Sequence, residues 1–188
     1  MKIGVIGIGM LGEAVVLNLL TSGYDVVVYN RTKEKTIEVE KKGAKVMDSP
    51  KTVAENTELI IIIVKDSTAV REVAFGENGI IKSKNEKLIV ADMSTIDSTE
   101  SKKIANQFQQ NHIQKLEIPV MGGPNVAIMG KLVMMASGPK DSFDQCKTIF
   151  EKIANKVFFL GEQGTANSIK LAMNLQITML ALSLSEGI

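Results

Sequence analysis

The 188-residue sequence has little of several residue types on which functional sites are commonly built. It has one cysteine, Cys146, which excludes an intrachain disulfide. Its one histidine, His112, follows a polar stretch, where we expect a surface residue. No cluster of histidine, cysteine and aspartate has the spacing of metal ligands, so the sequence predicts no metal site.

Long apolar runs and an excess of one charge are also absent. The longest uninterrupted apolar run, Leu59–Val64, is far too short to cross a bilayer, and the N-terminal apolar stretch is short and broken by glycine, unlike a signal peptide. With a net charge of +1 and interspersed charges, nothing indicates a nucleic-acid partner. We therefore expect a cytoplasmic protein with no membrane or nucleic-acid partner, which a single cysteine permits.

The sequence does contain a regular alternation of apolar runs with amphipathic stretches. This alternation is typical of an α/β fold, in which helices cover a mostly parallel sheet. Strands are expected near residues 2–7, 25–30, 44–47, 59–64, 87–92, 114–119, 131–137 and 156–160. Helices are expected near residues 11–22, 33–42, 50–56, 67–74, 97–110, 140–154 and 165–186. We expect one domain over residues 1–163 and a long helix over residues 164–188, with its apolar part from Leu171 buried.

The turn between the first expected strand and helix carries three glycines, in the pattern Gly7-x-Gly9-x-x-Gly12. In this context the first allows a tight turn, the second lets the backbone approach a pyrophosphate, and the third lets helix and strand pack closely. Unpaired amides at the helix start, around Met10 and Leu11, would face the phosphates. The pattern predicts a doubly wound, Rossmann-type fold that binds a dinucleotide, the alternative being a plain glycine turn.

The second expected strand ends in Asn30-Arg31-Thr32, where such folds contact the adenosine ribose. Folds that prefer NAD usually place a carboxylate there, and this strand end has none. A guanidinium, an amide and a hydroxyl suit a 2′-phosphate instead, because arginine can bind phosphate through two parallel hydrogen bonds. These residue types favour NADP over NAD. The alternative is a surface arginine beside a helix cap at Thr32, with Lys33 and Lys35 merely solvated.

Two further strand ends carry residues suited to binding a ligand. Ser94 and Thr95 follow a strand at its carboxyl end, where open α/β sheets bind ligands. Ser94 can donate to a substrate carboxylate and Thr95 can contact the cofactor, although both can instead cap the next helix. Gly122 and Gly123 follow another strand end, where their amides can approach a carboxylate or form a plain turn.

A lysine lies in an otherwise apolar stretch of the last expected helix. Lys170 and Asn174 are four residues apart and share one helix face. A buried lysine is costly without a partner or a task, and burial beside a nicotinamide cation would lower its pKa toward the range useful for proton transfer. Lys170 can then donate a proton to the alkoxide that hydride transfer creates, while Asn174 orients the lysine or the substrate. The alternative is a lysine that reaches solvent at the helix start.

Four segments, in order, resemble the β-hydroxyacid dehydrogenase family, which includes 3-hydroxyisobutyrate dehydrogenases, tartronate semialdehyde reductases and glyoxylate/succinic semialdehyde reductases. They are the glycine pattern, Asp92-Met-Ser94-Thr95, Pro119-Val-Met-Gly122-Gly123-Pro-x-x-Ala127-x-x-Gly130, and Gly164-x-x-x-x-x-Lys170-x-x-x-Asn174. The resemblance covers the whole chain. The site residues that it implies are Val64 and Lys65 in a loop under the cofactor, Ser94, Gly122 and Gly123 around a substrate carboxylate, and Lys170 with Asn174 as the catalytic pair.

The resemblance also implies a second, all-helical domain after the long helix, which closes the active site and mediates dimerisation. The end of the sequence at Ile188 is what we expect if that domain is missing. The full-length protein is accordingly expected to be a homodimer or a higher homo-oligomer.

Three departures from the family pattern concern the substrate more than the reaction. Met121 precedes the two glycines where the family has a serine, so a hydroxyl is lost from the site. Met173 replaces the first of two asparagines that often follow the lysine, while Asn174 retains the second. Ala166 replaces a glycine that is common two residues after Gly164.

Together these observations predict an NADP-dependent oxidoreductase that interconverts a short 3-hydroxy acid and its semialdehyde, or reduces glyoxylate-like aldehydes. One alternative is imine reduction on the same scaffold, which the retained Lys170 argues against because imine-reducing relatives commonly replace that residue. Another is a non-catalytic NADP-binding or dimerisation module, since a fold alone does not establish a function.

Overall fold

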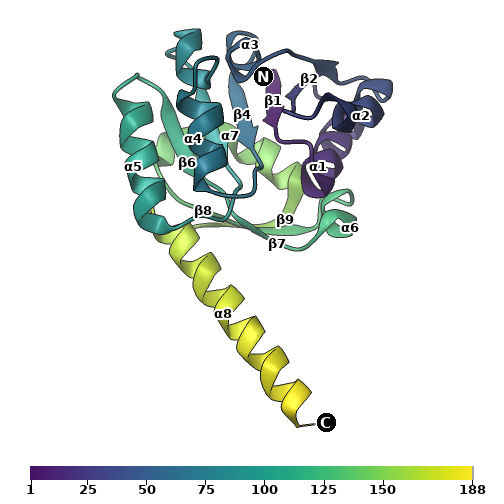
Figure 1. Cartoon of the computed structure of the whole chain (residues 1–188), viewed down its shortest axis with the longest axis vertical. Helices are drawn as coiled ribbons and strands as arrows, with labels where there is room; N and C mark the ends of the chain where they lie inside the picture. Colours follow the sequence, from purple (N-terminus) through teal and green to yellow (C-terminus); the bar gives the residue numbers. More distant parts are fainter. Residues whose placement is uncertain (188) are drawn as a thin grey trace.

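The computed structural model, which describes residues 1–187, alternates strands with helices along most of its length (Figure 1). The first half contains β1 (Ile3–Ile6), α1 (Met10–Thr21), β2 (Val26–Tyr29), the 3₁₀ helix η1 (Lys33–Thr36), α2 (Ile37–Lys41), β3 (Lys45–Val46), α3 (Pro50–Glu55), β4 (Leu59–Ile62), α4 (Ser67–Phe75), the 3₁₀ helix η2 (Ile80–Ser83) and β5 (Ile89–Asp92). The second half contains α5 (Ser98–Gln109), β6 (Gln114–Glu117), β7 (Val120–Met121), α6 (Pro124–Ala127), β8 (Leu132–Ala136), α7 (Lys140–Ile153), β9 (Ala154–Phe159) and α8 (Thr165–Glu186).

Six strands form a sheet, called sheet A, in the order β3-β2-β1-β4-β5-β6. Every neighbouring pair in it is parallel. The chain builds outward from β1 in one direction, then returns and builds outward from β4 in the other. This is the doubly wound arrangement expected from the sequence, and its switch point between β1 and β4 is where such sheets bind ligands.

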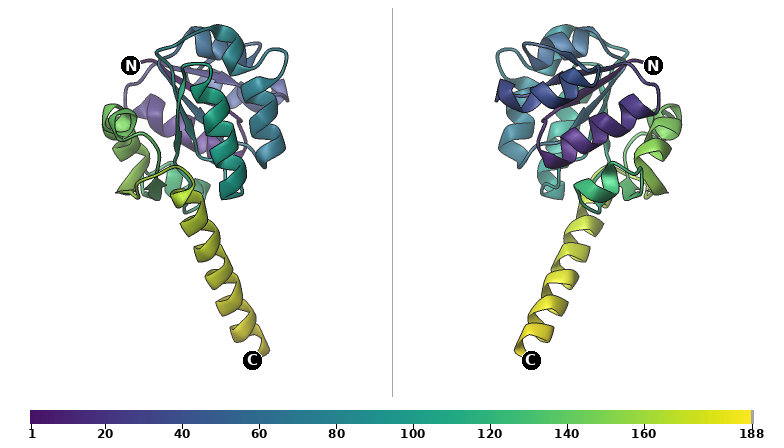
Figure 2. Two further views of the ribbon diagram at one scale, coloured as in Figure 1. Left: turned by 90° about the vertical axis from the view of Figure 1, so that its left-hand side faces the viewer. Right: turned by 90° about the vertical axis from the view of Figure 1, so that its right-hand side faces the viewer.

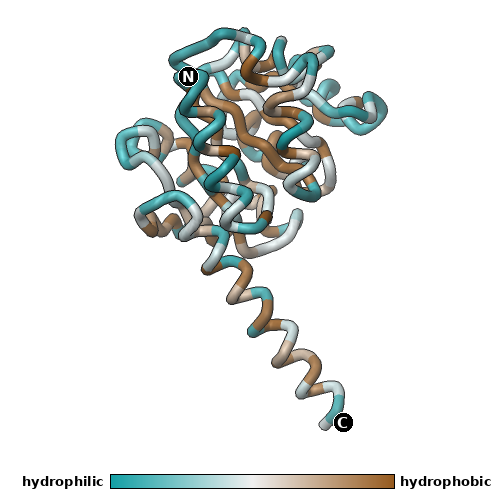
Figure 3. The backbone as a smooth tube through the Cα atoms, turned by 60° about the vertical axis from the view of Figure 1, so that its left-hand side comes forward, coloured by the Kyte–Doolittle hydropathy of each residue, from teal (hydrophilic) through white to brown (hydrophobic). Residues whose placement is uncertain are grey.

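The central strands β1, β2 and β4 of sheet A are apolar along their length because helices cover both faces. Val5 and Ile61 face the side where α1 and α7 pack, whereas Ile60 and Ile62 face the side of α3, α4 and α5. Both sets are fully buried. Figure 3 shows the resulting apolar segments running through the middle of the body. This packing fixes the ends of the strands, from which the site residues project.

A smaller sheet, called sheet B, has the order β7-β8-β9, with β7 antiparallel and β9 parallel to β8. A single bridge between Glu117 and Ser137 connects β6 to the end of β8. In Figure 1, sheet B lies between sheet A and the projecting part of α8. The apolar pattern predicts β8 and β9 as strands but does not distinguish a second sheet from a continuation of the first.

The expected elements are present, with several differences at a finer level. The helix expected over residues 33–42 is split into η1 and α2, and η2, β7 and α6 were not expected. These are elements of two to five residues, too short to show a hydrophobic period. Among residues 1–187, no helix has both the length and the apolar character of a transbilayer span.

Helix α8 leaves the body after its first two turns and projects freely (Figure 2). Its buried residues are Ala166, Asn167 and Lys170, whereas Leu175 is 63% and Leu184 is 68% exposed. The expectation that the helix is buried from Leu171 onward is therefore wrong for this chain. The apolar side chains are present, but no other element within residues 1–187 reaches them. Ile188, the last residue of the expected segment 164–188, lies outside the described residues.

The start of α8 is held by a buried carboxylate on β6. Oε1 of Glu117 accepts a hydrogen bond from the Gly164 amide at 2.9 Å, and Oε2 accepts from the Asn167 amide at 3.3 Å and from Oγ of Ser137 at 2.8 Å. That hydroxyl oxygen accepts in turn from the Ala166 amide at 3.2 Å. Amides at a helix start lack intrahelical partners and carry partial positive charge, so an anion is favourable here. Gly164 has a φ of +97°, which explains the glycine at this position.

We predict that Glu117→Ala destabilises the full-length protein by about 3 kcal/mol, because it leaves two buried amides and a hydroxyl without their acceptor. The free energy of unfolding in urea checks this value, and faster hydrogen exchange at Gly164 and Asn167 would locate the effect. Glu151→Ala on α7 is the matched control, since its exposed i,i+4 pair with Lys147 contributes under about 0.5 kcal/mol. Equal stability of the two variants would contradict the anchoring role of Glu117.

Candidate active site

The glycine turn between β1 and α1 has the close packing that its pattern predicts. A Cβ atom on Gly12 would collide with the carbonyl oxygen of Gly7, so only glycine allows α1 to start this close to β1. Gly9 precedes the first residue of α1, and a Cβ atom on it would meet nothing within 4 Å. The first amides of α1 have no partners within the helix, and the open space beside Gly9 leaves room for a phosphate to approach them.

Asn30 fixes this turn against the end of β2. Its Oδ1 accepts a hydrogen bond from the Ile8 amide at 2.9 Å, while its Nδ2 donates to the carbonyl of Thr32 at 2.7 Å. Both polar ends of the amide are thus used within the protein. Asn30 thus joins the glycine turn to the loop after β2, and its expected contact with the cofactor stays a prediction.

A pocket of about 470 Å³ runs along the carboxyl ends of β1, β2 and β4. Seven residues of the predicted cofactor site line it, namely Gly7, Gly9, Asn30, Arg31, Thr32, Val64 and Lys65. The other four predicted cofactor residues, Met10, Leu11, Gly12 and Thr95, lie outside its lining. Met10 is 81% exposed at the helix start. Further lining residues that were not expected include Tyr29, Lys35, Pro50, Ile63, Val73 and Asn78.

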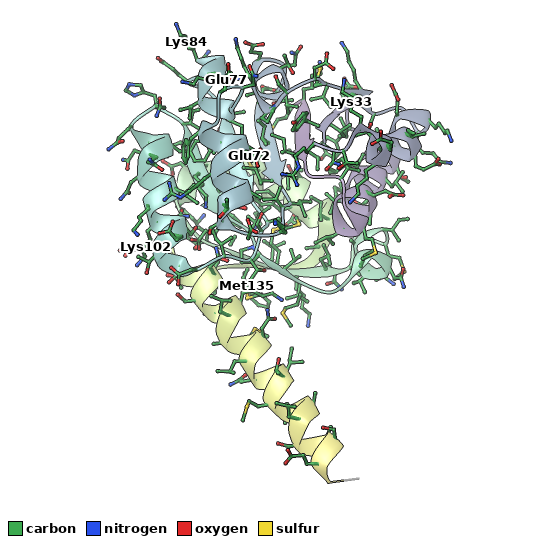
Figure 4. The ribbon with its side chains drawn as sticks, viewed as in Figure 1. Lys33, Glu72, Glu77, Lys84, Lys102 and Met135 are labelled. Carbon is green, nitrogen blue, oxygen red and sulfur yellow. The ribbon has the colours of Figure 1, made fainter. Side chains whose placement is uncertain are left out.

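The pocket also contains carboxylates that the sequence analysis did not place there. Glu72 on α4 lies 3.6 Å from Nη1 of Arg31, measured from its Oε2, and both side chains are mainly exposed. Glu77, just beyond α4, lines the same pocket, and Figure 4 labels both. Arg31 is therefore neither free nor buried. Its guanidinium forms an ion pair with Glu72, which a bound phosphate would have to replace.

The ends of β4 and β5 are tied together beside the pocket. Oγ of Ser94 accepts a hydrogen bond from the Val64 amide at 3.1 Å, and the Ser94 amide donates to Oδ1 of Asp92 at 3.0 Å. Asp92 is fully buried with Lys115, whose Nζ lies 3.5 Å from Oδ2 and donates to Oγ of Ser101 at 3.0 Å. Burial raises the pKa of Asp92, and the Lys115 ammonium opposes that rise. The buried Asp92–Lys115 pair thus holds the loop that carries Ser94 in place.

Lys170 lies at the second turn of α8, where the helix still contacts the body. Its residue is 9% exposed, and its Nζ donates to the Met121 sulfur at 2.8 Å. Burial lowers the pKa of Lys170. One turn earlier, Oδ1 of Asn167 accepts from the Ile96 amide at 3.2 Å, which joins α8 to the loop after Thr95. The alternative of a lysine extended into solvent therefore does not apply.

The other residues predicted from the sequence lie at several places in the structure. Gly122 and Gly123 directly follow Met121 and are exposed, with Gly122 at a φ of +116°. Asn174 is exposed one turn beyond Lys170, on the part of α8 that leaves the body. His112 is exposed at the end of α5. Within residues 1–187, the structure gathers no group of three side chains that could ligate a metal.

A doubly wound sheet, a glycine turn at its switch point and a pocket along its strand ends define a dinucleotide-binding domain. The chain belongs to the family described as the NAD binding domain of 6-phosphogluconate dehydrogenase, whose model matches residues 2–161.

Relatives among named proteins confirm the resemblance to β-hydroxyacid dehydrogenases. The chain is 34% identical over 188 residues to the uncharacterized oxidoreductase YfjR of Bacillus subtilis, covering all of this chain and 66% of that protein. It is 32% identical to glyoxylate/succinic semialdehyde reductase 1 of Arabidopsis thaliana, covering all of this chain and 65% of that protein. It is also 30% identical to the human cytokine-like nuclear factor N-PAC, covering 34% of that protein. The chain thus spans about two thirds or less of these relatives.

Solved structures share the fold. Psf3 in complex with NADP+ and 2-OPP has a TM-score of 0.87 at 26% identity, covering 99% of this chain and 69% of that one. The 3-hydroxyisobutyrate dehydrogenase of Mycobacterium tuberculosis has a TM-score of 0.93 at 19% identity, and an imine reductase from Myxococcus stipitatus in complex with NADP+ has 0.92 at 20%. They cover 99% and 98% of this chain and 63% of each of those chains. At such identities these two likenesses concern the fold alone.

We predict that Asn30→Ala weakens NADPH binding about tenfold, because the turn at Ile8 loses its hydrogen bond to the β2 loop and must be ordered on binding. Isothermal titration of the full-length protein measures the dissociation constant. Lys33→Ala is the control, since Lys33 pairs with Asp48 outside the pocket lining. An Asn30 variant that binds NADPH as tightly as the control would contradict the role of this amide.

Proposed function

We propose that the full-length protein is an NADP-dependent oxidoreductase that interconverts a short 3-hydroxy acid and its semialdehyde, or reduces glyoxylate-like aldehydes. The observation that carries this proposal is the buried amine of Lys170, one turn of α8 after Asn167, which binds the loop that follows Thr95. Within residues 1–187 no carboxylate forms an ion pair with this amine. Keeping a buried amine without an anion costs stability, and proton transfer is a task that explains it.

In this proposal Lys170 holds and moves the proton. When bound, the nicotinamide cofactor supplies or accepts the hydride. In reduction the Lys170 ammonium donates a proton to the oxygen that becomes the alcohol, and in oxidation the neutral amine removes it. Because burial lowers the pKa of Lys170, more of its amine is neutral at a given pH than that of an exposed lysine.

A short carboxylate-bearing substrate fits the groups around this amine. Ser94 lies at the carboxyl end of β5, and Gly122 and Gly123 offer exposed backbone amides directly after Met121. Hydroxyl and amide donors together are suited to a carboxylate. Asn174, on the same helix face as Lys170, would orient the substrate from the side of α8.

NADP is the proposed cofactor, with NAD as the weaker one. Arg31, Thr32 and Lys35 line one end of the pocket and can together hold a 2′-phosphate. Glu72 opposes this preference to a degree, since it is near Arg31 and would repel the phosphate. We therefore propose a preference rather than an exclusive requirement. In this arrangement Thr95 contacts the cofactor from the end of β5.

Two other functions remain candidates. Imine reduction needs the same cofactor geometry, and the fold is shared with an imine reductase. A non-catalytic module is the other, given the relative named as a nuclear factor. The buried amine favours the first proposal over both, because neither of the others requires a desolvated lysine at this place.

We also propose a homodimer or higher homo-oligomer in a reducing compartment such as the cytoplasm. The apolar side chains along α8, including Leu175, Leu180 and Leu184, offer a surface that association would cover. Cys146 is buried in α7, and burial raises its pKa to about 12, so the thiol is unreactive.

We predict turnover by the full-length protein of at least one of glyoxylate, succinic, methylmalonic or tartronic semialdehyde, measured as initial rates of NADPH oxidation. Lys170→Met should lower kcat at least about 100-fold, because it removes the proton donor, while leaving the dissociation constant of NADPH nearly unchanged. In the oxidation direction the wild-type rate should rise with pH through the lowered pKa of Lys170, and in reduction it should fall over the same range.

The matched control is Lys140→Met, at the exposed start of α7, which should keep wild-type kcat. Aldehyde reduction that persists in Lys170→Met would contradict the catalytic role. Tight NADPH binding without turnover of any of these aldehydes would favour an imine substrate or a non-catalytic module.

Arg31 tests the cofactor preference. Arg31→Ala should weaken NADPH binding about 10- to 100-fold and NADH binding little, since a charged hydrogen-bonded pair contributes about 1.5–3 kcal/mol. Glu72→Gln should do the reverse and tighten NADPH binding, because it removes a negative charge beside the guanidinium. Titrations of each variant with both cofactors measure the two effects. Equal losses for NADPH and NADH in Arg31→Ala would mean that Arg31 does not recognise the phosphate.

A further inference from the structure

Met121 occupies the position where the resemblance places a serine, and its side chain contacts the proposed catalytic amine. The distance from Nζ of Lys170 to Sδ of Met121 is 2.8 Å, and no other hydrogen-bond acceptor of Nζ is found within residues 1–187. The departure from the family pattern and the contact of the amine thus fall on the same side chain.

Both ends of this contact lie on fixed parts of the structure. Met121 ends β7 and pairs with Val133 of β8 in an antiparallel ladder. Lys170 follows the turn of α8 that Glu117 and Asn167 hold to the body. The backbones from which the sulfur and the amine extend are therefore both held in place.

Most of the charged groups near the start of α8 have other partners. On the elements packed against it they are Asp92 and Asp97 around the β5–α5 loop, Glu100, Lys102 and Lys103 on α5, and Lys115 and Glu117 on β6, while β7 and β8 carry none. Asp92 pairs with Lys115, and Asp97 caps α5. Glu100 pairs with Lys103, and Glu117 accepts from α8 amides. Lys102 lies against Gly164, near the base of α8 in Figure 4.

A thioether is a weak acceptor, and it is also bulky and apolar. Beside an ammonium it excludes water but returns little of the lost hydration, whereas an oxygen acceptor would return much more. We propose that Met121 is a positioning residue of this site, whose thioether holds the Lys170 amine in place while withholding a strong acceptor from its proton. This inference rests on the proposed function, in which Lys170 transfers that proton.

The consequence concerns which form of the amine is favoured. With sulfur rather than oxygen as its contact, the ammonium is stabilised less relative to the neutral amine, which acts in the same direction as the burial that lowers the pKa of Lys170. An oxygen at the same place would stabilise the ammonium and raise that pKa. At a fixed pH below the pKa, each unit of such a rise reduces the neutral fraction, and with it the rate of alcohol oxidation, about tenfold.

The test is the titration of Lys170 itself, measured on the full-length protein as the pH dependence of its acetylation by acetic anhydride. Mass spectrometry of the peptide that contains Lys170 reads the extent of labelling, so the measurement needs no turnover. Met121→Gln supplies an oxygen acceptor on a chain of similar length, and Met121→Leu supplies similar volume with no acceptor. Thermal unfolding and NADPH binding verify that both variants keep the fold.

We expect the pKa of Lys170 to rise by about one unit or more in Met121→Gln and to stay at or below the wild-type value in Met121→Leu. The pH at which alcohol oxidation by the glutamine variant rises should shift by the same amount. An ordinary lysine pKa in the wild-type protein, or equal pKa values in the two variants, would overturn the inference. Absence of turnover alone would contradict the proposed function and leave the titration result standing.

Discussion

The buried carboxylate of Glu117 is the contact on which the candidate site depends. It lies where the last strand of sheet A ends and where α8 begins, and it accepts from two amides at the start of that helix. A helix start otherwise needs water or capping side chains for these amides, and none of the α8 residues supplies a cap here. Because the acceptor lies on β6, the position of sheet A determines where α8 begins. The contacts of Glu117 with the start of α8 therefore also fix the position of Lys170, which lies in the second turn of that helix.

A second buried pair performs a similar task one strand away. Asp92 and Lys115 neutralise each other beneath the loop of Ser94, and Ser94 in turn accepts from the Val64 amide. The pair joins β5 to β6, and it holds the end of β5 in place because breaking a buried pair leaves an uncompensated charge. Asn167 then links this loop to α8 through the Ile96 amide. Hydrogen bonds and a buried ion pair thus connect the loops after β4 and β5 with the start of α8.

The sequence predicted the parts of this framework that depend on local pattern. Continuous apolar runs such as Leu59–Val64 are typical of strands that helices cover on both faces. The spacing of Gly7, Gly9 and Gly12 between a strand and a helix indicated that the two pack closely. Lys170 was conspicuous because an amine in an apolar stretch is costly. Each of these signals lies within a few residues of the feature that it predicts.

The features that escaped prediction are pairings between distant segments. Glu72 reaches Arg31 from a helix 41 positions further along the chain, and Glu117 meets Gly164 across 47 positions. Nothing in the local pattern around either glutamate distinguishes it from a solvated surface residue. The exposure of α8 has another cause. Its apolar side chains indicate that something covers them, and no pattern within the helix can tell whether the cover lies in the same 188 residues.

The environment of Lys170 gives a physical meaning to one departure from the family pattern, the methionine at position 121. Replacing a serine by Met121 removes a hydroxyl, which taken alone suggests a weaker grip on a carboxylate. In the structure the new side chain turns toward the amine instead, so the change acts on the proton and not only on the substrate. A thioether tolerates close approach by a cation without holding its proton firmly. The carboxylate then depends more on the Gly122 and Gly123 amides and on Ser94. In the proposed mechanism this one substitution affects both substrate binding and proton transfer. The position that would have contacted the substrate instead influences how readily Lys170 loses its proton.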